Sequence, residues 1–150
     1  MKEVTNSMKM TVAGYSRNEG LARMCVSAFA SQLDPTIEEI NDIKAAVSEA
    51  VTNCIVHGYK DTIGDIQIEL KIIENSTLYI KIKDKGCGIP DVKKAMEPLF
   101  TTSPETERSG LGFSVMESFM DKLKVNSKVG KGTSVTMTKR LVKRNEQTDR

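Results

Sequence analysis

Alternation of apolar and polar residues predicts five strands in this chain. A first strand is expected at residues 8–13, where every second residue is apolar. Two more are expected at 66–72 and 78–82, joined by a turn into a hairpin with one buried face. A second hairpin is expected around Gly130 and Gly132. The apolar residues that define these strands are Met8, Met10, Val12, Ile66, Ile68, Leu70, Ile72, Leu78, Ile80, Ile82, Val125, Val129, Val135 and Met137.

Apolar residues spaced three or four apart predict the helices. One helix is expected to begin at a capping-box sequence, residues 16–19, and to stop at Asp34. A second capping box, residues 36–39, opens a longer helix from Ile37 that is expected to end at Gly58, a C-terminal capping glycine. The apolar face expected for the first helix is Leu21, Met24, Cys25, Ala28, Phe29 and Leu33.

The longer helix has two sides that differ in chemistry. Glu49 and Asn53 are four residues apart and project together, within about 40° of each other. A carboxylate beside a carboxamide suits a Mg²⁺–phosphate site, although such pairs are also common on solvent-facing helices. His57, one turn later, is expected to interact with the last carbonyls of the helix rather than with a ligand. The opposite side is an apolar stripe suited to a sheet: Ile40, Ile43, Val47, Val51 and Cys54.

The order of elements predicts an α/β (α+β) two-layer sandwich. A short helix is expected at 91–96 and a mobile loop or lid at 97–109. Between the lid and the last hairpin, a helix is expected to turn Leu111, Val115, Phe119 and Leu123 inward. Because the strands are joined mainly as hairpins, the sheet is expected to be mixed and mostly antiparallel, with helices on one face.

Composition and charge fit one globular domain. The 150 residues are 39% hydrophobic and 28% charged, which predicts a single domain at 1–150 with its core at 8–140 and a flexible basic tail at 141–150. Neither a membrane-spanning run nor a secretory leader is expected, which favours a cytoplasmic protein. The three scattered cysteines indicate neither a disulfide framework nor a zinc site. The net charge of +2 lies largely in residues 139–144, which lack aromatic residues, so no nucleic-acid binding is expected.

Two glycine-containing motifs lie downstream of the longer helix. Asp84, Gly86 and Gly88 follow a strand directly, a pattern typical either of a tight turn or of backbone that approaches a flat ligand. A carboxylate at that place can accept a hydrogen bond from the exocyclic amine of adenine. Gly110 and Gly112 open a helix, where glycine-rich backbone can bind an anion. Arg108 and the hydroxyls of Thr101 and Thr102 can add donors to phosphate oxygens.

In this order, the three motifs resemble the Bergerat ATP-binding fold of gyrase, histidine kinases and mismatch-repair ATPases. The longer segments 49–59 and 98–113 are similar to the anti-sigma serine kinases within that superfamily. The resemblance covers residues 8–140. It implies that Glu49 is the general base, that Asn53 binds Mg²⁺ and that Asp84 reads the adenine amine. It also implies that ATP or ADP is held by Asn53, Asp84, Gly86, Gly88, Ile89, Thr101, Thr102, Arg108, Ser109, Gly110, Leu111 and Gly112.

The same resemblance implies partners. Members of the family bind a sporulation sigma factor as a homodimer and phosphorylate a serine on an anti-anti-sigma protein. Arg23, on the exposed side of the first helix, is a candidate contact for a protein partner. Two alternatives remain at this point: a nucleotide-dependent binding module without kinase turnover, and a histidine-kinase catalytic domain. The second would need a phosphoacceptor histidine on a separate helix, whereas the chain has only His57.

Overall fold

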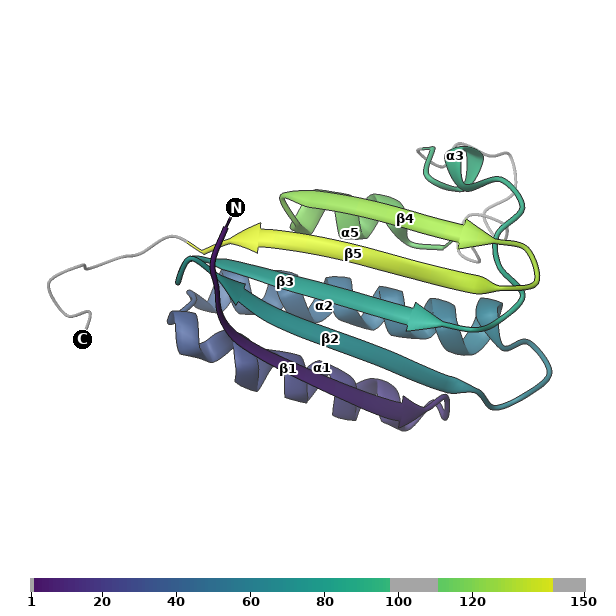
Figure 1. The fold of residues 1–150 in the computed structure, drawn as a ribbon, viewed down its shortest axis with the longest axis horizontal. Coiled ribbons are helices and arrows are strands. Elements are labelled where there is room, and N and C mark those ends of the chain that lie inside the picture. The colour runs from purple at the N-terminus through teal and green to yellow at the C-terminus, as the bar shows by residue number, and fades with distance from the viewer. Residues whose placement is uncertain (1, 98–110, 142–150) are drawn as a thin grey trace, which may run out of the picture.

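The computed structural model describes residues 2–97 and 111–141, which form two layers (Figure 1). Five strands form one sheet in the order β1-β2-β3-β5-β4, and the long helices lie together behind it. The strands are β1 (Val4–Ala13), β2 (Asp65–Ile73), β3 (Thr77–Asp84), β4 (Lys122–Lys128) and β5 (Gly132–Arg140). The helices are α1 (Asn18–Ala30), η1 (Ser31–Leu33), α2 (Ile37–Asn53), η2 (Cys54–Gly58), α3 (Val92–Ala95) and α5 (Phe113–Phe119).

The sheet confirms the expected two-layer architecture and narrows its topology. All four strand pairings of the described residues are antiparallel. The described sheet is therefore fully antiparallel rather than mixed. Both expected hairpins are present, β2 with β3 and β4 with β5. Strand β1 begins at Val4, four residues before the expected start, because its polar N-terminal half pairs with β2 as an exposed edge.

Helix α1 turns a different face to the core than the sequence predicts. Leu21 and Met24 are 50% and 61% exposed, and the bulky residues expected inside lie mostly outside. Helix α1 packs chiefly on α2 rather than on the sheet. Because a close helix–helix contact favours small side chains, residue size misleads the prediction here. The buried residues of α1 are Ala22, Val26, Phe29 and Ala30.

The start of α1 also differs from the expected capping box. Arg17 occupies the N-cap position, and no side chain caps the helix there. The Asn18 side chain instead donates a hydrogen bond to the Ala13 carbonyl at 2.8 Å, which ties the first turn back to the end of β1. The tight β1–α1 connection therefore takes the place of the cap that Ser16 was expected to supply.

Helix α2 begins as predicted. The Glu39 amide donates to Thr36 Oγ1 at 3.0 Å, and the Thr36 amide donates to Glu39 Oε1 at 2.8 Å, which completes the capping box. The expected apolar stripe is the buried side of α2, with Ile40 only partly buried at its start. The helix continues through the π-helical turn η2 and ends at Gly58, as predicted. Gly58 does not have a positive φ, so its expected role as a C-terminal cap is wrong.

Helix α5 has a shifted inner face. Phe113, Met116 and the following Met120 are buried, whereas Val115 is 37% exposed and Leu123 belongs to β4. The helix starts only after Gly112, whose φ of +68° is left-handed, so Leu111 lies outside it.

The ends of the described chain add two points. Leu141 is 3% exposed and its amide donates to the Ser76 carbonyl at 2.9 Å, so the packed chain extends one residue into the expected tail. The rest of that tail, and the expected lid apart from Glu97, lie outside the described residues. Within the described ranges, no helix has the length and apolar character needed to cross a bilayer.

Candidate functional site

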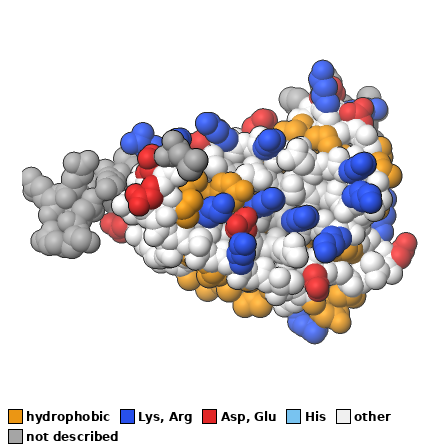
Figure 2. All heavy atoms as spheres, in the orientation of Figure 1, with side chains coloured by type: hydrophobic (Ala, Val, Ile, Leu, Met, Phe, Trp, Pro, Cys, Tyr) orange, Lys and Arg blue, Asp and Glu red, His pale blue; other side chains and the backbone are white. Residues whose placement is uncertain are grey.

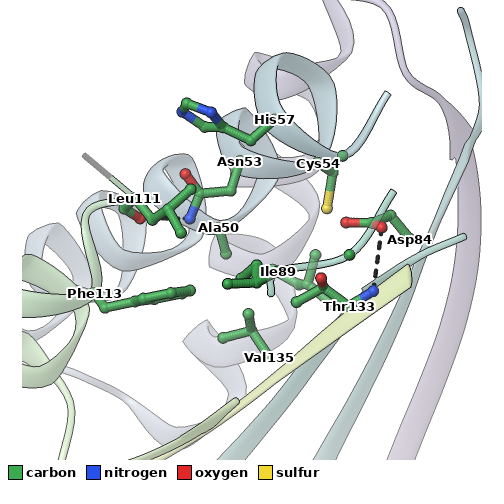
Figure 3. Close-up of a pocket in the computed structure, with 13 residues that line it drawn as sticks. Ala50, Asn53, Cys54, His57, Asp84, Ile89, Leu111, Phe113, Thr133 and Val135 are labelled. Atoms are coloured by element: carbon green, nitrogen blue, oxygen red, sulfur yellow. Dashed lines mark hydrogen bonds between the residues drawn. The ribbon is translucent and has the colours of Figure 1, made fainter. Parts of the chain in front are cut away.

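A pocket lies between the C-terminal part of α2 and the ends of β3 and β5 (Figure 3). The segment after β3 and the segment leading into α5 close its other sides. Elements from both layers and from both halves of the chain therefore meet at this pocket. Its lining residues are Ala50, Asn53, Cys54, His57, Gly58, Ile82, Asp84, Gly88, Ile89, Leu111, Phe113, Thr133 and Val135.

Asp84 is the one charged residue that is buried within the described ranges, at 4% exposed. Its Oδ1 atom accepts a hydrogen bond from the Gly86 amide at 2.8 Å and a longer one from the Thr133 amide at 3.3 Å. The second of these bonds is the dashed line in Figure 3. A buried carboxylate needs such donors to offset the loss of hydration. The two backbone amides engage Oδ1 and leave Oδ2 as the oxygen that can accept from other groups.

Two glycines let backbone pass close to Asp84. A Cβ atom at Gly58 would lie 2.8 Å from Asp84 Oδ2, and one at Gly86 would overlap the Gly58 carbonyl. The Cys87 amide donates to that carbonyl at 3.0 Å, so η2 and the segment after β3 touch through backbone alone. Gly88 has a φ of +80° and no room for a side chain against the Lys128 carbonyl. A role of Gly86 and Gly88 in shaping a flat site stays a prediction.

Cys54 is a pocket residue that the sequence placed only in the apolar stripe. The sulfur of Cys54 faces the Asp84 side chain in Figure 3. Burial raises the pKa of the Cys54 thiol far above its ordinary value, and the neighbouring charge of Asp84 raises it further. No local pattern could have predicted this pair, because the two residues belong to different layers of the fold.

Glu49 and Asn53 lie together on the side of α2 that faces the start of α5. Both are half-buried. A Cβ atom at Gly112 would overlap Glu49 Oε1, so the glycine lets the carboxylate approach the backbone. Asn53 Nδ2 donates to the Leu111 carbonyl. Because a carbonyl accepts only from a donor, the amide nitrogen must point to Leu111, which leaves the Asn53 oxygen available to a ligand.

These groups fit a magnesium ion that is bound mainly by other ligands. Within the described ranges, no cluster of three or more His, Cys, Asp or Glu residues could hold a metal ion. Mg²⁺ usually keeps several waters and takes phosphate oxygens together with one or two protein oxygens. The free amide oxygen of Asn53 is such a ligand, and the Glu49 carboxylate lies one turn away on the same side of α2.

His57 lines the pocket, although the sequence assigned it to the helix end. In Figure 3 its ring lies on the side of Asn53 and Leu111 and points away from Asp84. Partial burial lowers the pKa of His57, and the positive charge of Lys60 lowers it further. The neutral ring is therefore favoured near neutral pH.

Arg23 makes contacts inside the chain. Its Nη1 atom lies 2.9 Å from a carboxylate oxygen of Glu19 and donates to Ser48 Oγ at 3.2 Å, linking α1 to α2. The guanidinium is partly exposed, with 37% of the side chain open to solvent. A contact between Arg23 and a partner stays a prediction.

Some of the other predicted site residues line the pocket, and the rest lie outside the described residues. Ile89 and Leu111 line the pocket as expected, beside Asp84 and Asn53. Phe113, Thr133 and Val135 also line it but were not predicted as site residues, because only the folded chain brings α5 and β5 to α2. The expected phosphate-binding residues that lie outside the described ranges are Thr101, Thr102, Arg108, Ser109 and Gly110.

Comparisons with known proteins agree with this geometry. Residues 16–139 match the family model of the histidine kinase-like ATPase domain. The chain is 58% identical over 137 residues to the anti-sigma F factor of Thermoanaerobacter sp. (strain X514), a match that covers 91% of this chain and 95% of that relative. It is 50% identical over 139 residues to the anti-sigma F factor of Geobacillus kaustophilus, covering 92% and 94% of the two chains.

Solved structures show the same fold at low sequence identity. The RsbU and RsbW domains of Rv1364c from Mycobacterium tuberculosis match with a TM-score of 0.67 at 19% identity, over 91% of this chain and 32% of that one. A histidine kinase domain from Erythrobacter litoralis matches with a TM-score of 0.57 at 20% identity, over 82% of this chain and 61% of that one.

The matched ATPase family is a family of nucleotide-binding domains. Of the described residues expected to bind a nucleotide, Asn53, Asp84, Gly88, Ile89 and Leu111 line one pocket, whereas Gly86 and Gly112 do not. The family model and the curated relatives both span most of the chain. The chain therefore belongs to the histidine kinase-like ATPase family and, within it, to the anti-sigma F factors.

Proposed function

We propose that the chain is an ATP-dependent protein-serine kinase that also binds and inhibits a sigma factor. The observation that carries the kinase assignment is the arrangement along one pocket. A buried carboxylate, Asp84, lines it, and the Glu49–Asn53 pair lies beside the segment that leads into α5. Such a site can hold the nucleobase of a nucleotide near Asp84 and its phosphates near Glu49 and Asn53.

The adenine end is assigned to Asp84. Its Oδ2 atom is the oxygen that the Gly86 and Thr133 amides do not engage. The exocyclic amine of adenine can donate to this oxygen, whereas guanine would present a carbonyl there and meet repulsion. Apolar side chains of Ile89 and Val135 in the same pocket suit the faces of a flat base.

The reacting end is assigned to Glu49 and Asn53. The Asn53 oxygen would hold Mg²⁺, which when bound supplies charge neutralisation for the phosphates. Glu49 would take the proton from the serine hydroxyl, because its carboxylate lies on the same side of α2 and within reach of the segment at Gly112. The serine oxygen then bonds to the γ-phosphorus as the bond from that phosphorus to the leaving ADP oxygen breaks.

The proposed partners are inferred from the relatives of this chain. The curated relatives carry the name anti-sigma F factor, which supports a sigma factor as the inhibited partner. We assign the phosphorylated serine to an anti-anti-sigma protein and the active form to a homodimer, with Arg23 among the candidate contacts. Phosphorylation would then remove the antagonist and keep the sigma factor bound.

Replacing the proposed base tests the kinase assignment. The substitution Glu49→Gln should lower transfer from ATP to the antagonist by about 100-fold or more, since general base catalysis contributes roughly that much. Nucleotide affinity should stay within a few-fold, because Glu49 is not assigned to the adenine end. The measurement is transfer of labelled γ-phosphate, together with nucleotide binding. Glu38→Gln, an exposed change in the first turn of the same helix, is the matched control.

Three outcomes separate the possible functions. Label that is stable in acid and lies on a serine of the antagonist supports the kinase. Bound nucleotide and bound sigma factor without any transferred label would indicate a binding module instead. Unchanged transfer by the Glu49→Gln variant would remove Glu49 from the role of base.

A further inference from the structure

The outer face of the sheet carries an unusual concentration of positive charge. Helices α1, α2 and α5 lie on the other side, and the strands alternate between apolar residues toward the helices and polar residues outward. Figure 2 looks onto this outer face, where Lys and Arg side chains are spread over the strands and most Asp and Glu lie toward its rim. The outward charged residues of the strands are Lys9, Lys71, Lys81, Lys83, Lys122, Lys124, Lys128 and Arg140, against Asp65 and Glu69.

This surface, called the basic face below, is much more positively charged than the chain as a whole. The whole chain has 22 Lys and Arg against 20 Asp and Glu, a net charge of only +2. Because the basic face holds eight of the cations and two of the acids, the remaining surface has an excess of acidic side chains. The fold therefore separates charge, which creates a positive potential over one side of the molecule.

Strand register arranges these lysines in rows across the sheet. One row runs through Lys9, Glu69, Lys81, Thr136 and Lys124, as the pairings of adjacent strands show. Its three lysines lie on every second strand, so neighbouring lysines are about 10 Å apart. Lys83 lies two residues further along β3, beside Gln67 and Ser134.

Most of these lysines have no acidic partner on the face. Glu69 lies within 3.8 Å of Lys9 and 3.9 Å of Lys71 and so serves two lysines. Among the described residues, no carboxylate lies within ion-pair distance of Lys81, Lys83 or Lys124. Several like charges held close together on a flat surface repel each other, and an acidic ligand would relieve that repulsion.

The shape and chemistry of the basic face favour one kind of occupant. A second copy in the same orientation would set lysines against lysines. Tyr79 is the one aromatic residue on the outward strand positions, and the Lys71 ammonium already lies 4.9 Å from its ring, so the face offers little for stacked bases. Carboxylates seven residues apart on an α-helix are about 10.5 Å apart, which matches the spacing of the lysine row.

We propose that the basic face docks an acidic helix of a partner protein, laid across the strands along the lysine row. A helix of about 13 residues would span the five strands. A hollow on this face, into which such a helix can settle, has three lysines and one carboxylate among its lining residues, Lys9, Lys81, Lys83 and Glu69. The proposal rests on the proposed function for the identity of the partner, either the sigma factor or the serine-bearing antagonist. It places this contact on the side of the sheet opposite α2.

Charge reversal on the face tests the proposal. The variant Lys83→Glu/Lys124→Glu changes two exposed residues whose neighbours across the strands are uncharged, so it creates no new repulsion with Glu69. The control is Lys93→Glu/Lys94→Glu, which makes the same change of charge at two exposed residues outside the strands. Binding of the purified sigma factor and of the antagonist is measured at low and high salt, with ATP affinity recorded in parallel.

The face variant should bind one of the two partners about tenfold or more weakly at low salt, and the difference should shrink at high salt. Its ATP affinity should equal that of the control. Equal partner binding by both variants would overturn the proposal, whereas loss of ATP binding or phosphoryl transfer in the unmodified protein would count against the proposed function alone.

A synthetic probe tests the face independently of the natural partners. A helical peptide of about 15 residues with Glu at seven-residue intervals should bind the wild type more tightly than its Gln counterpart. The face variant should lose that preference. If the wild type bound both peptides equally, the assignment to an acidic helix would be overturned. It would also be overturned if the wild type bound a DNA duplex and the face variant did not, a result that would indicate nucleic acid as the ligand.

Discussion

At the scale of single residues, the pocket is organised around Asp84. Burying a carboxylate costs free energy unless donors replace its water shell. Here the donors are the amides of Gly86 and Thr133. Glycine at position 58 is required beside this cluster for space rather than for a special φ.

Adding a methyl group at Gly58 should weaken nucleotide binding. In Gly58→Ala the new Cβ would lie 2.8 Å from Asp84 Oδ2 and would push the carboxylate from its place. We expect affinity for ATP to fall by about tenfold or more, which is roughly 1.4 kcal/mol. The measurement is an ATP titration of the folded variant.

The matched control is Gly20→Ala in α1, where the nearest atom to an added Cβ is the flexible end of Arg23 at 3.6 Å. Its ATP affinity should stay at the wild-type value. A Gly58→Ala protein that bound ATP as tightly as this control would show that Asp84 tolerates the displacement.

At the scale of elements, α2 connects the core to the pocket. One side packs Ile43, Val47 and Val51 into the core, and the other carries Glu49 and Asn53. The capping box at Thr36 and Glu39 begins the helix, and the wide turn of η2 brings Cys54 and Gly58 against Asp84. One helix therefore fixes the distance between the two ends of the site.

Removing the cap of α2 should lower stability without changing the pocket. Thr36→Ala should reduce the free energy of unfolding by about 1 kcal/mol, the usual cost of losing an N-cap side chain. Affinity of the folded protein for ATP should not change, since the cap is more than three turns from Glu49. Denaturant titration and ATP binding measure the two effects.

The comparison for this change is Thr62→Ala, an exposed loop residue. It should alter the free energy of unfolding by only a few tenths of a kcal/mol. A Thr36→Ala protein as stable as that control would mean that tertiary packing alone holds the start of α2.

At the scale of the whole molecule, the pocket joins segments from both halves of the chain. It is lined by residues of α2, η2, β3, β5 and α5, so a bound ligand touches both layers. A ligand that binds only the folded state stabilises it by mass action. Nucleotide binding should therefore stabilise the domain as a unit.

ATP with Mg²⁺ should raise the midpoint temperature of thermal unfolding, and the size of the increase should depend on the nucleobase. At a ligand concentration of about 100 times Kd, the gain is roughly 2.7 kcal/mol. For a domain of this size, that corresponds to an increase of about 5–11 °C. GTP at the same concentration should give a much smaller shift, because Asp84 Oδ2 would face a carbonyl of the base; equal shifts would argue against the adenine assignment. Thermal unfolding followed by circular dichroism measures both.

The sequence by itself determined β2 and β3, the presence of both hairpins and the start of α2. Alternation along β2 and β3 and the capping box at Thr36 are local patterns. They depend only on residues that are close in the sequence, so they can be predicted without the tertiary structure. The sequence also indicated Glu49, Asn53 and Asp84 as candidate site residues, because their spacing and order resemble a known family.

Only the tertiary structure decided the features that depend on packing between distant segments. The inner face of α1 follows from its packing on α2, where residue size misled the prediction, and the inner face of α5 is shifted because the chain has already passed into β4 at Leu123. The contact of Cys54 with Asp84 and the crowding at Gly58 join two layers of the fold. The basic face exists because strand register aligns lysines from β1, β3 and β4, which lie far apart in the chain.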